Sequence, residues 1–232
     1  DLESAIAAIR PAMDGKAAVL PLLNGLSHID ALKAAFGAGN VLGGVAQISA
    51  TLAADGTVKH MTPLAALQFG ELDGTMSPRV TALVDAYAAT PIKAAAVPDI
   101  MGAMWSKLVF LGTLAAATVL MRANIGEIAA AAGGADWVER LLERNIAVAT
   151  AHGHPPQPQM LASYRTTLRD GKTVTASMLR DLESGGRVEA DHILGYLLEA
   201  ARAAGVDSSV QEAAYIHAKA YEARRAAGRL PR

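Results

Sequence analysis

The spacing of apolar residues divides the chain near residue 100. Before this point, short apolar runs alternate with amphipathic stretches, and the chain opens directly on a helical pattern. Residues 17–23 form a mostly apolar run that ends at Asn24 and Gly25, as expected for a buried parallel strand that meets a turn. Further strands are predicted over residues 41–52, 64–72 and 92–97, and helices over residues 28–36 and 78–88. This alternation predicts the later portion of an α/β Rossmann-like domain over residues 1–98.

From residue 99 onward the pattern is helical throughout. Helices are predicted over residues 101–122, 137–152, 160–168, 176–183, 188–204 and 210–227. Ser209 and Glu212 have the Ser-x-x-Glu spacing of a capping box, which predicts the start of the last helix. We therefore expect an all-helical C-terminal domain over residues 99–232.

The composition excludes several kinds of partner. The formal net charge of −1 provides no basic surface for nucleic acid, and the absence of cysteine rules out disulfides and thiolate metal sites. The apolar run from Leu108 to Met121 is shorter than the roughly 20 residues that a membrane span needs. We expect this run to be a buried core helix, in a soluble, cytoplasmic protein with no membrane partner.

Three residues at helical spacing are the first candidates for chemistry. Lys107, Leu111 and Ala115 follow one another at intervals of four residues, so they share one face of the predicted helix. Lys107 either lies at a boundary with its ammonium in water, or faces a cleft and donates a proton to a substrate carbonyl as the alkoxide forms. The spacing alone leaves both interpretations open.

Ser177 and Glu189 form a second constellation. They lie on consecutive predicted helices, so a hydroxyl and a carboxylate could together orient a small polar substrate, and Glu189 could pair with Lys107. The alternative is structural: Ser177 caps its helix, and Glu189 occupies a first helical turn, where the helix dipole favours a carboxylate. The residues by themselves again leave both interpretations open.

Four segments together carry a family resemblance. They are Leu23-Asn24-Gly25, Trp105-Ser106-Lys107-Leu108, Ser177-Met178-Leu179-Arg180-Asp181, and Gly186-Arg187-Val188-Glu189-Ala190-Asp191 followed by Gly195. In order and spacing they resemble the ketopantoate reductase (2-dehydropantoate 2-reductase) family over nearly the whole chain. The resemblance implies an enzyme of the kind found in pantothenate biosynthesis, which reduces a 2-oxo acid to the 2-hydroxy acid with NADPH. It also implies a Rossmann domain and an all-helical second domain, with the site between them.

The resemblance also implies a role for each candidate residue. Lys107 corresponds to the general acid, and Ser177 and Glu189 correspond to groups that contact the substrate. Asn24 corresponds to the asparagine beside the nicotinamide ribose and the substrate, and Asn24 and Gly25 would contact the cofactor. No metal is implied. The expected partner is a small 2-oxo acid, and the apolar, Ala-rich helices of residues 99–232 are expected to bind substrate and to form a homodimer.

Leu111 and Ala115 depart from the family pattern. The family often has asparagines at these positions, where they hold the polar end of ketopantoate. Without those amides the pocket cannot form hydrogen bonds to a substrate hydroxyl there. We therefore predict a 2-oxo acid with a less polar tail than ketopantoate, and we include Leu111 and Ala115 among the substrate-binding residues.

The family's amino-terminal nucleotide-binding fingerprint is not in the sequence. The nearest match, Gly37-Ala38-Gly39-Asn40, lacks the third glycine and leads into a strand rather than a helix. The preference for NADPH therefore comes from the resemblance alone, and we expect the chain to be part of a longer protein.

The remaining polar candidates are expected to be structural or supporting. They are His152 and His154 in a loop, His192 and His217 on helices, Asp181 and Asp191 as braces of the Ser177 and Glu189 helices, and Thr118 and Asn124 behind the site. Two other functions stay open: a non-catalytic NADP-sensing protein on the same scaffold, and a helical self-association module. The presence of Lys107, Ser177 and Glu189 at family spacing favours the reductase over both.

Overall fold

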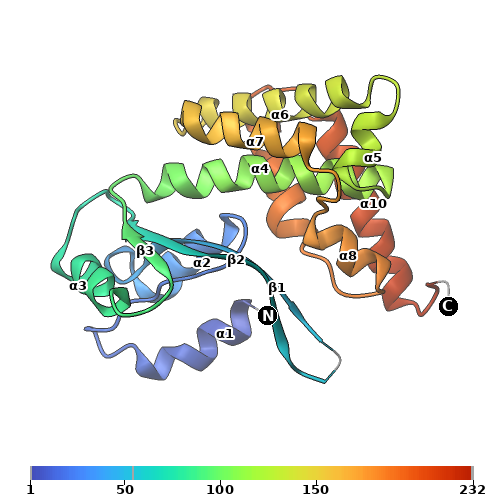
Figure 1. The fold of residues 1–232 in the computed structure, drawn as a ribbon. Coiled ribbons are helices and arrows are strands. Elements are labelled where there is room, and N and C mark those ends of the chain that lie inside the picture. The colour runs from blue at the N-terminus through green and yellow to red at the C-terminus, as the bar shows by residue number, and fades with distance from the viewer. Residues whose placement is uncertain (1, 54, 231–232) are drawn as a thin grey trace. The chain divides into compact units, whose positions relative to one another are not determined.

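The computed structural model describes residues 2–53 and 55–230, which form two compact units, residues 1–104 and 105–232 (Figure 1). Among the described residues, every strand ends before residue 97 and every element from Ile100 onward is helical. The α/β fold followed by an all-helical region, as predicted from the sequence, is thereby confirmed. The first unit contains α1 (Leu2–Ile9), η1 (Arg10–Ala12), α2 (Ser27–Phe36), η2 (Ala38–Asn40), β1 (Leu42–Leu52), β2 (Val58–Glu71), α3 (Pro78–Tyr87) and β3 (Lys93–Ala96).

The sheet of the first unit has the strand order β1-β2-β3. Strands β1 and β2 form an antiparallel hairpin, and β3 pairs with β2 in parallel. The hairpin register shifts between Ile48 and Ala50, where the imidazole Nε2 of His60 lies 3.1 Å from the carbonyl oxygen of Leu64. The segment 64–72 predicted as a separate strand is therefore the second part of a longer strand that continues across an irregularity.

One face of this sheet forms the core of the unit with α3. Leu42, Leu67, Phe69 and Val80 make one buried cluster, and Phe69 and Val80 have no exposed surface. Because side chains alternate along a strand, Leu67 and Phe69 of β2 lie on the same face of the sheet and join Val80 of α3 in this cluster.

On the opposite face of the sheet, two glycines allow the start of a helix to pack closely. Gly43 and Gly70 are cross-strand partners, and a Cβ added to either would press on the side chain of Ile100, at 2.8 and 3.1 Å respectively. At Gly70 the added Cβ would also lie 2.3 Å from the carbonyl oxygen of Val97. The glycine pair therefore lets the first residue of α4 (Ile100–Met121) rest directly on the sheet.

The strand predicted over residues 17–23 is wrong. Among the described residues this segment forms only an isolated parallel bridge between Val19 and Val41, and Leu22 and Leu23 are 47% and 48% exposed. A buried parallel strand needs a ladder of partners on both sides. Two hydrogen bonds, from Val19 N to Asn40 O and from Leu42 N to Val19 O, do not make one.

The second unit is a helical assembly around the remainder of α4. It contains α5 (Ile125–Ala130), α6 (Gly134–Ala151), α7 (Pro158–Asp170), α8 (Ser177–Glu183), the π-helical turn η3 (Asp191–Gly195), α9 (Tyr196–Ala203) and α10 (Ser209–Ala226). Helix α4 is long and apolar enough to cross a membrane, but 72% of its most apolar 18-residue window is buried inside the protein. That burial is typical of a core helix, as its sequence predicted.

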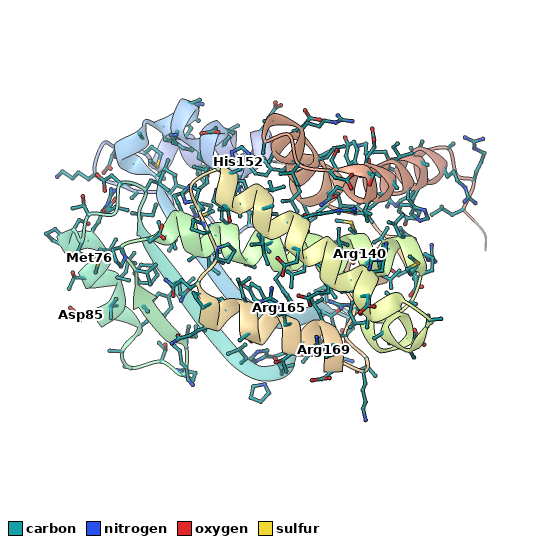
Figure 2. The ribbon with its side chains drawn as sticks, turned by 90° about the horizontal axis from the view of Figure 1, so that it is seen from above. Met76, Asp85, Arg140, His152, Arg165 and Arg169 are labelled. Atoms are coloured by element: carbon teal, nitrogen blue, oxygen red, sulfur yellow. The ribbon has the colours of Figure 1, made fainter. Side chains whose placement is uncertain are left out.

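Helices α6 and α7 lie side by side (Figures 1 and 2). Arg165 on α7 donates hydrogen bonds to Glu139 and Glu143, which are one turn apart on α6. Tyr164, the residue before it, stacks on Phe110 of α4 with 4.7 Å between the ring centroids. The apolar side of α7 therefore packs on the core helix while its polar side is tied to α6.

The capping box predicted at Ser209 and Glu212 is wrong. Helix α10 already begins at Ser209, its N-cap residue is Ser208 without a side-chain cap, and the Ser209 amide donates to Asp207 Oδ1 at 2.9 Å. A complete capping box occurs instead at the start of α5, where Asn124 and Glu127 exchange two hydrogen bonds of 2.9 Å. Asn124 therefore satisfies helix-terminal amides.

Replacing Gly70 with alanine tests the close approach of α4 to the sheet. The added methyl group would meet the Val97 carbonyl, so we expect Gly70→Ala to lower the free energy of unfolding by about 1–3 kcal/mol. Urea denaturation would measure the change. Gly39→Ala is the matched control, because a Cβ at Gly39 meets nothing within 4 Å. An equal loss in both variants would contradict the argument.

Candidate functional site

Lys107 is a half-buried lysine near the start of a buried helix. Its neighbours Trp105, Ser106 and Leu108 are 5% exposed or less. Burial lowers the pKa of Lys107 below the ordinary value of a lysine, and the negative charge of Glu189 offsets part of this change. The negative charge of Glu189 therefore favours the ammonium form of Lys107, and a direct pairing of the two side chains stays a prediction.

The helical turn that carries Lys107 is held by an aromatic cluster. The indole of Trp105 stacks with the rings of His152 and His154 at centroid distances of 5.2 and 5.9 Å, and Tyr196 packs against it at 5.8 Å. His152, at the end of α6 (Figure 2), places Nε2 3.0 Å from the carbonyl oxygen of Ala200 in α9. The cluster fixes α4 against both helices, and no local pattern in the sequence indicates it.

Glu189 lies immediately before a helix that starts with a π-helical turn. Ahead of this turn, the Ile193 amide donates an α-helical hydrogen bond of 3.3 Å to the Glu189 carbonyl, four residues earlier. Asp191 accepts hydrogen bonds from Tyr215 at 2.7 Å and from Lys219 at 3.0 Å, both on α10. Asp191 therefore braces this helix, as expected, and the exposed Glu189 side chain projects from a fixed backbone. π-Turns occur frequently at functional sites.

Ser177 is the first residue of α8 and has an exposed side chain. The N-cap position belongs to Ala176, so Ser177 is not the cap that the structural interpretation required. The loop after α8 is closed by a hydrogen bond of 2.7 Å from the Gly186 amide to the Asp181 carbonyl. The Gly186 carbonyl accepts in turn from the Tyr221 hydroxyl at 2.7 Å.

Leu111 and Ala115 differ in how accessible they are. Leu111, one turn after Lys107, is half-buried, whereas Ala115 is only 2% exposed. Of the two positions where the family often carries an amide, Leu111 is therefore the one with surface available for a ligand.

A series of buried hydrogen bonds between side chains fixes α4 against α6 and α10. Gln211 on α10 donates to Asn145 on α6 at 2.6 Å, and Asn145 donates to Thr113 on α4 at 2.9 Å. All three residues have no exposed surface. Thr118, one further turn along α4, donates to the Leu114 carbonyl at 2.8 Å. These buried bonds specify how three helices pack, because breaking one leaves a polar group without a partner.

Asn24 and Gly25 belong to the first unit. Asn24 is half-buried, and Gly25 adopts a φ of 81°, a conformation that favours glycine. The segment Ala38–Asn40 is a short 3-10 helix that leads into β1, so it is not the start of a helix that could face a pyrophosphate.

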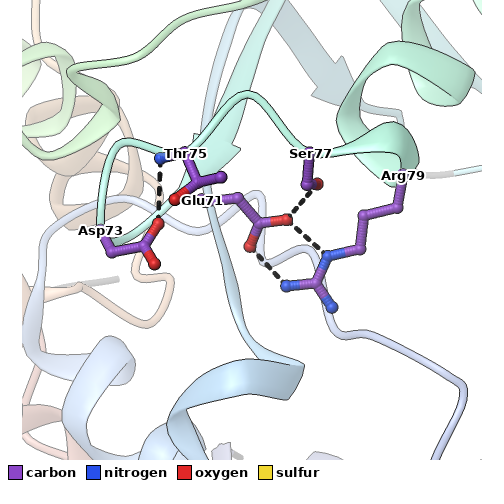
Figure 3. A network of polar contacts seen from close by, with 5 residues as sticks. All are labelled: Glu71, Asp73, Thr75, Ser77 and Arg79. Carbon is purple, nitrogen blue, oxygen red and sulfur yellow. Dashed lines mark hydrogen bonds and ion pairs between the residues drawn. The ribbon is translucent and has the colours of Figure 1, made fainter.

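A surface pocket of about 500 Å³ lies elsewhere in the first unit, between η2 and the β2–α3 connection. Its polar groups bind one another: Glu71 accepts from Ser77 at 2.5 Å and from Arg79 at 2.6 Å, and Asp73 accepts from the Thr75 amide at 2.9 Å (Figure 3). The Arg79 guanidinium lowers the pKa of Glu71. The lining contains no sequence-predicted site residue, and the network is a brace for the start of α3.

Comparison with known proteins decides the family. The ketopantoate reductase PanE/ApbA model matches residues 1–74, and the ketopantoate reductase PanE/ApbA C-terminal model matches residues 99–222. The chain belongs to the ketopantoate reductase family. This membership places it among the oxidoreductases, as the motifs around Lys107 and Ser177 predicted.

Individual relatives agree with this assignment. The uncharacterized oxidoreductase YkpB of Bacillus subtilis is 30% identical over 216 residues, which cover 93% of this chain and 71% of YkpB. The crystal structure of 2-dehydropantoate 2-reductase from Methylococcus capsulatus is 27% identical with a TM-score of 0.80, covering 95% of this chain and 74% of that one. A structure of D-mandelate dehydrogenase with NADH has a TM-score of 0.83 at 18% identity, covers 97% of this chain and 75% of its own, and shares the fold.

The pairing of Lys107 with Glu189 can be tested without enzymatic activity. Removing the Glu189 charge in Glu189→Gln should lower the pKa of Lys107 further, because that charge now favours the ammonium form. NMR titration of reductively methylated protein, with the Lys107 signal assigned from Lys107→Arg, would measure the change. Glu183→Gln, which removes a charge paired with Arg122, should leave the Lys107 pKa unchanged. An unchanged or higher pKa in Glu189→Gln would exclude the pairing.

Proposed function

We propose that this protein reduces a 2-oxo acid to the 2-hydroxy acid with NADPH, as a ketopantoate reductase-type enzyme of the cytoplasm. The observation that carries the proposal is Lys107, a half-buried ammonium with Glu189 in electrostatic reach, at the position of the family's general acid. Residues 1–98 would then contribute to the NADP-binding domain, and residues 99–232 would bind substrate and form the homodimer interface.

Lys107 would bind the keto oxygen of the substrate. Its ammonium donates a hydrogen bond to that oxygen, stabilises the negative charge that grows there, and then transfers a proton to the alkoxide. Burial lowers the pKa of Lys107, which makes the proton easier to transfer than from a lysine in water. The negative charge of Glu189 offsets part of this change, because it favours the ammonium form of Lys107.

Among the described residues, candidate contacts are found for the nicotinamide end of the cofactor but not for its pyrophosphate. Asn24 and Gly25 form a turn with a side-chain amide beside a residue that lacks a Cβ, which suits close approach of a nicotinamide ribose. When bound, the reduced nicotinamide supplies the hydride that the keto carbon accepts. A glycine-rich pyrophosphate turn is not found among the described residues, and the D-mandelate dehydrogenase structure is a complex with NADH. NADPH is therefore proposed from the family resemblance, and assays should include both nucleotides.

Ser177 and Glu189 would orient the substrate, and Leu111 would contact its tail. The exposed Ser177 hydroxyl can donate and accept hydrogen bonds, and the exposed Glu189 carboxylate can accept them, without leaving a buried group unsatisfied. Leu111 offers only apolar surface one turn from Lys107, with the buried Ala115 beyond it. The proposed substrate is therefore a 2-oxo acid with a less polar tail than ketopantoate.

Removal of the Lys107 ammonium should abolish most turnover. In the full-length protein, we expect Lys107→Ala to lower kcat/KM for 2-oxo acid reduction by about 10²–10⁴-fold, because the general acid is lost. The parent should lose activity as the pH rises through the lowered Lys107 pKa, since only the ammonium form donates a proton. NADPH consumption and cofactor binding would be followed together. Tight cofactor binding by the parent without turnover on any 2-oxo acid would instead favour the sensing protein.

Restoring an amide at position 111 should change substrate preference. Leu111→Asn can form a hydrogen bond to a hydroxylated tail, so we expect the ratio of kcat/KM for ketopantoate to that for 2-oxoisovalerate to rise by about tenfold or more. Leu111→Met keeps the volume and apolar character and should leave the ratio unchanged. A parent enzyme that already prefers ketopantoate strongly would refute the predicted apolar tail.

A further inference from the structure

Helix α10 holds the backbone just before Glu189. The Tyr221 hydroxyl donates a hydrogen bond to the Gly186 carbonyl at 2.7 Å, and Arg225 Nε donates one to the Gly185 carbonyl at 2.8 Å. Tyr221 is 7% exposed, so its ring is packed in the protein and its hydroxyl has a fixed direction. The loop that follows α8 is therefore fastened to α10 three residues before the Glu189 carboxylate.

The same helix also holds the backbone just after Glu189. Asp191, the first residue of the π-helical turn η3, accepts hydrogen bonds from Tyr215 at 2.7 Å and from Lys219 at 3.0 Å. Tyr215 comes close to this turn because residue 195 is a glycine: a Cβ on Gly195 would lie 3.0 Å from the ring carbon Cε2 of Tyr215. Tyr215 therefore spans the turn, with its hydroxyl at the first residue and its ring beside the last.

The π-helical turn is held on its inner side by packing. Ala190 and Leu194 have no exposed surface, and Ile193 is 3% exposed. π-Helical hydrogen bonding is rare and occurs mostly as a single turn within an α-helix, frequently at functional sites. With the inner side packed and the outer side bonded to Tyr215, the backbone at Glu189 cannot shift without loss of one of these contacts.

We propose that Tyr215 and Tyr221 are positioning residues, which act on the substrate through Glu189. The inference rests on the proposed function, in which Glu189 orients the 2-oxo acid. Each hydroxyl fixes the chain within three residues of Glu189, so neither tyrosine needs to touch the substrate itself. A small misplacement of a substrate-orienting group weakens its effect strongly. Helix α10 thereby contributes to substrate recognition, although it carries none of the family motifs.

Steady-state kinetics of the full-length protein can test this role. Tyr215→Phe and Tyr221→Phe each remove one hydroxyl and keep the ring. With NADPH and 2-oxoisovalerate, we expect KM for the acid to rise about threefold to tenfold in each variant, with unchanged affinity for the nucleotide. Tyr164→Phe is the matched control, because Tyr164 lies on α7 and stacks on Phe110 of α4. It should keep the parental KM.

Dependence on Glu189 separates positioning from a purely structural role. In a Glu189→Ala background the carboxylate to be positioned is absent, so adding Tyr215→Phe or Tyr221→Phe should leave KM for the acid unchanged. A structural role would raise KM by the same factor with and without Glu189. The proposal is overturned by such additive effects, or by a parental KM in both single variants.

Amide hydrogen exchange gives a measurement that does not need activity. The Ile193 amide, which donates to the Glu189 carbonyl, should exchange about tenfold faster in Tyr215→Phe and at the parental rate in Tyr164→Phe. Parental exchange in Tyr215→Phe would contradict the proposal. A parent protein that reduces no 2-oxo acid would overturn the proposed function, whereas faster exchange would still show that Tyr215 holds the Glu189 backbone, so the two failures are distinguishable.

Discussion

The burial of α4 sets the conditions for both the stability and the chemistry of this protein. In its 22 residues the helix carries a single ionisable side chain, Lys107. The hydroxyls of Thr113 and Thr118 return to backbone carbonyls of the same helix at 2.7 and 2.8 Å, so they can be buried at little cost. A lysine ammonium cannot be compensated in this way by carbonyls of its own helix, so its burial costs more free energy. It is tolerated because it lies near the start of the helix, half-buried, with a carboxylate in electrostatic reach.

The polar chain across α4, α6 and α10 shows how a largely apolar, Ala-rich assembly can select one arrangement. Alanine and leucine surfaces can slide past one another with small changes in buried area, whereas hydrogen-bonded side chains cannot. Asn145 joins Thr113 to Gln211, and any rotation of α4 would separate at least one pair. The Gln211 Oε1 atom is buried and has no hydrogen-bond partner in the structure. These three hydrogen-bonded side chains therefore make the helix packing more specific, at some cost in the free energy of unfolding.

Local signals in the sequence predicted the helices well, because periodicity and termination are local properties. Gly37 ends α2 with a φ of 86°, and the apolar run after Lys107 is a core helix, both as predicted. Contacts between segments that are distant in sequence could not be predicted from these local patterns. The stacking of Trp105 with His152, and the polar chain through Asn145, join residues far apart in sequence. The motifs located Lys107 and Glu189, but only the fold brings their charges together.

Two errors have the same physical origin. Residues 17–23 have the composition of a buried strand, and Ser209 with Glu212 has the spacing of a capping box. Both patterns are necessary for the structure they indicate, but neither is sufficient. A strand also needs neighbours along its length, and a capping residue must itself stand at the N-cap position, just outside the helix. Asn124 and Glu127 meet the second condition, and Ser209, already inside α10, does not.

The accessibility of Glu189 bears on how Lys107 could act repeatedly. A general acid must recover its proton after each turnover, and a buried lysine that loses its proton in an apolar surrounding regains it slowly without a polar route. Glu189 is exposed, and its negative charge favours the ammonium form of Lys107. Burial makes it easier for Lys107 to donate its proton, and the charge of Glu189 makes it easier for the lysine to regain one. The two opposing effects on one pKa are therefore complementary requirements of the same proposed step.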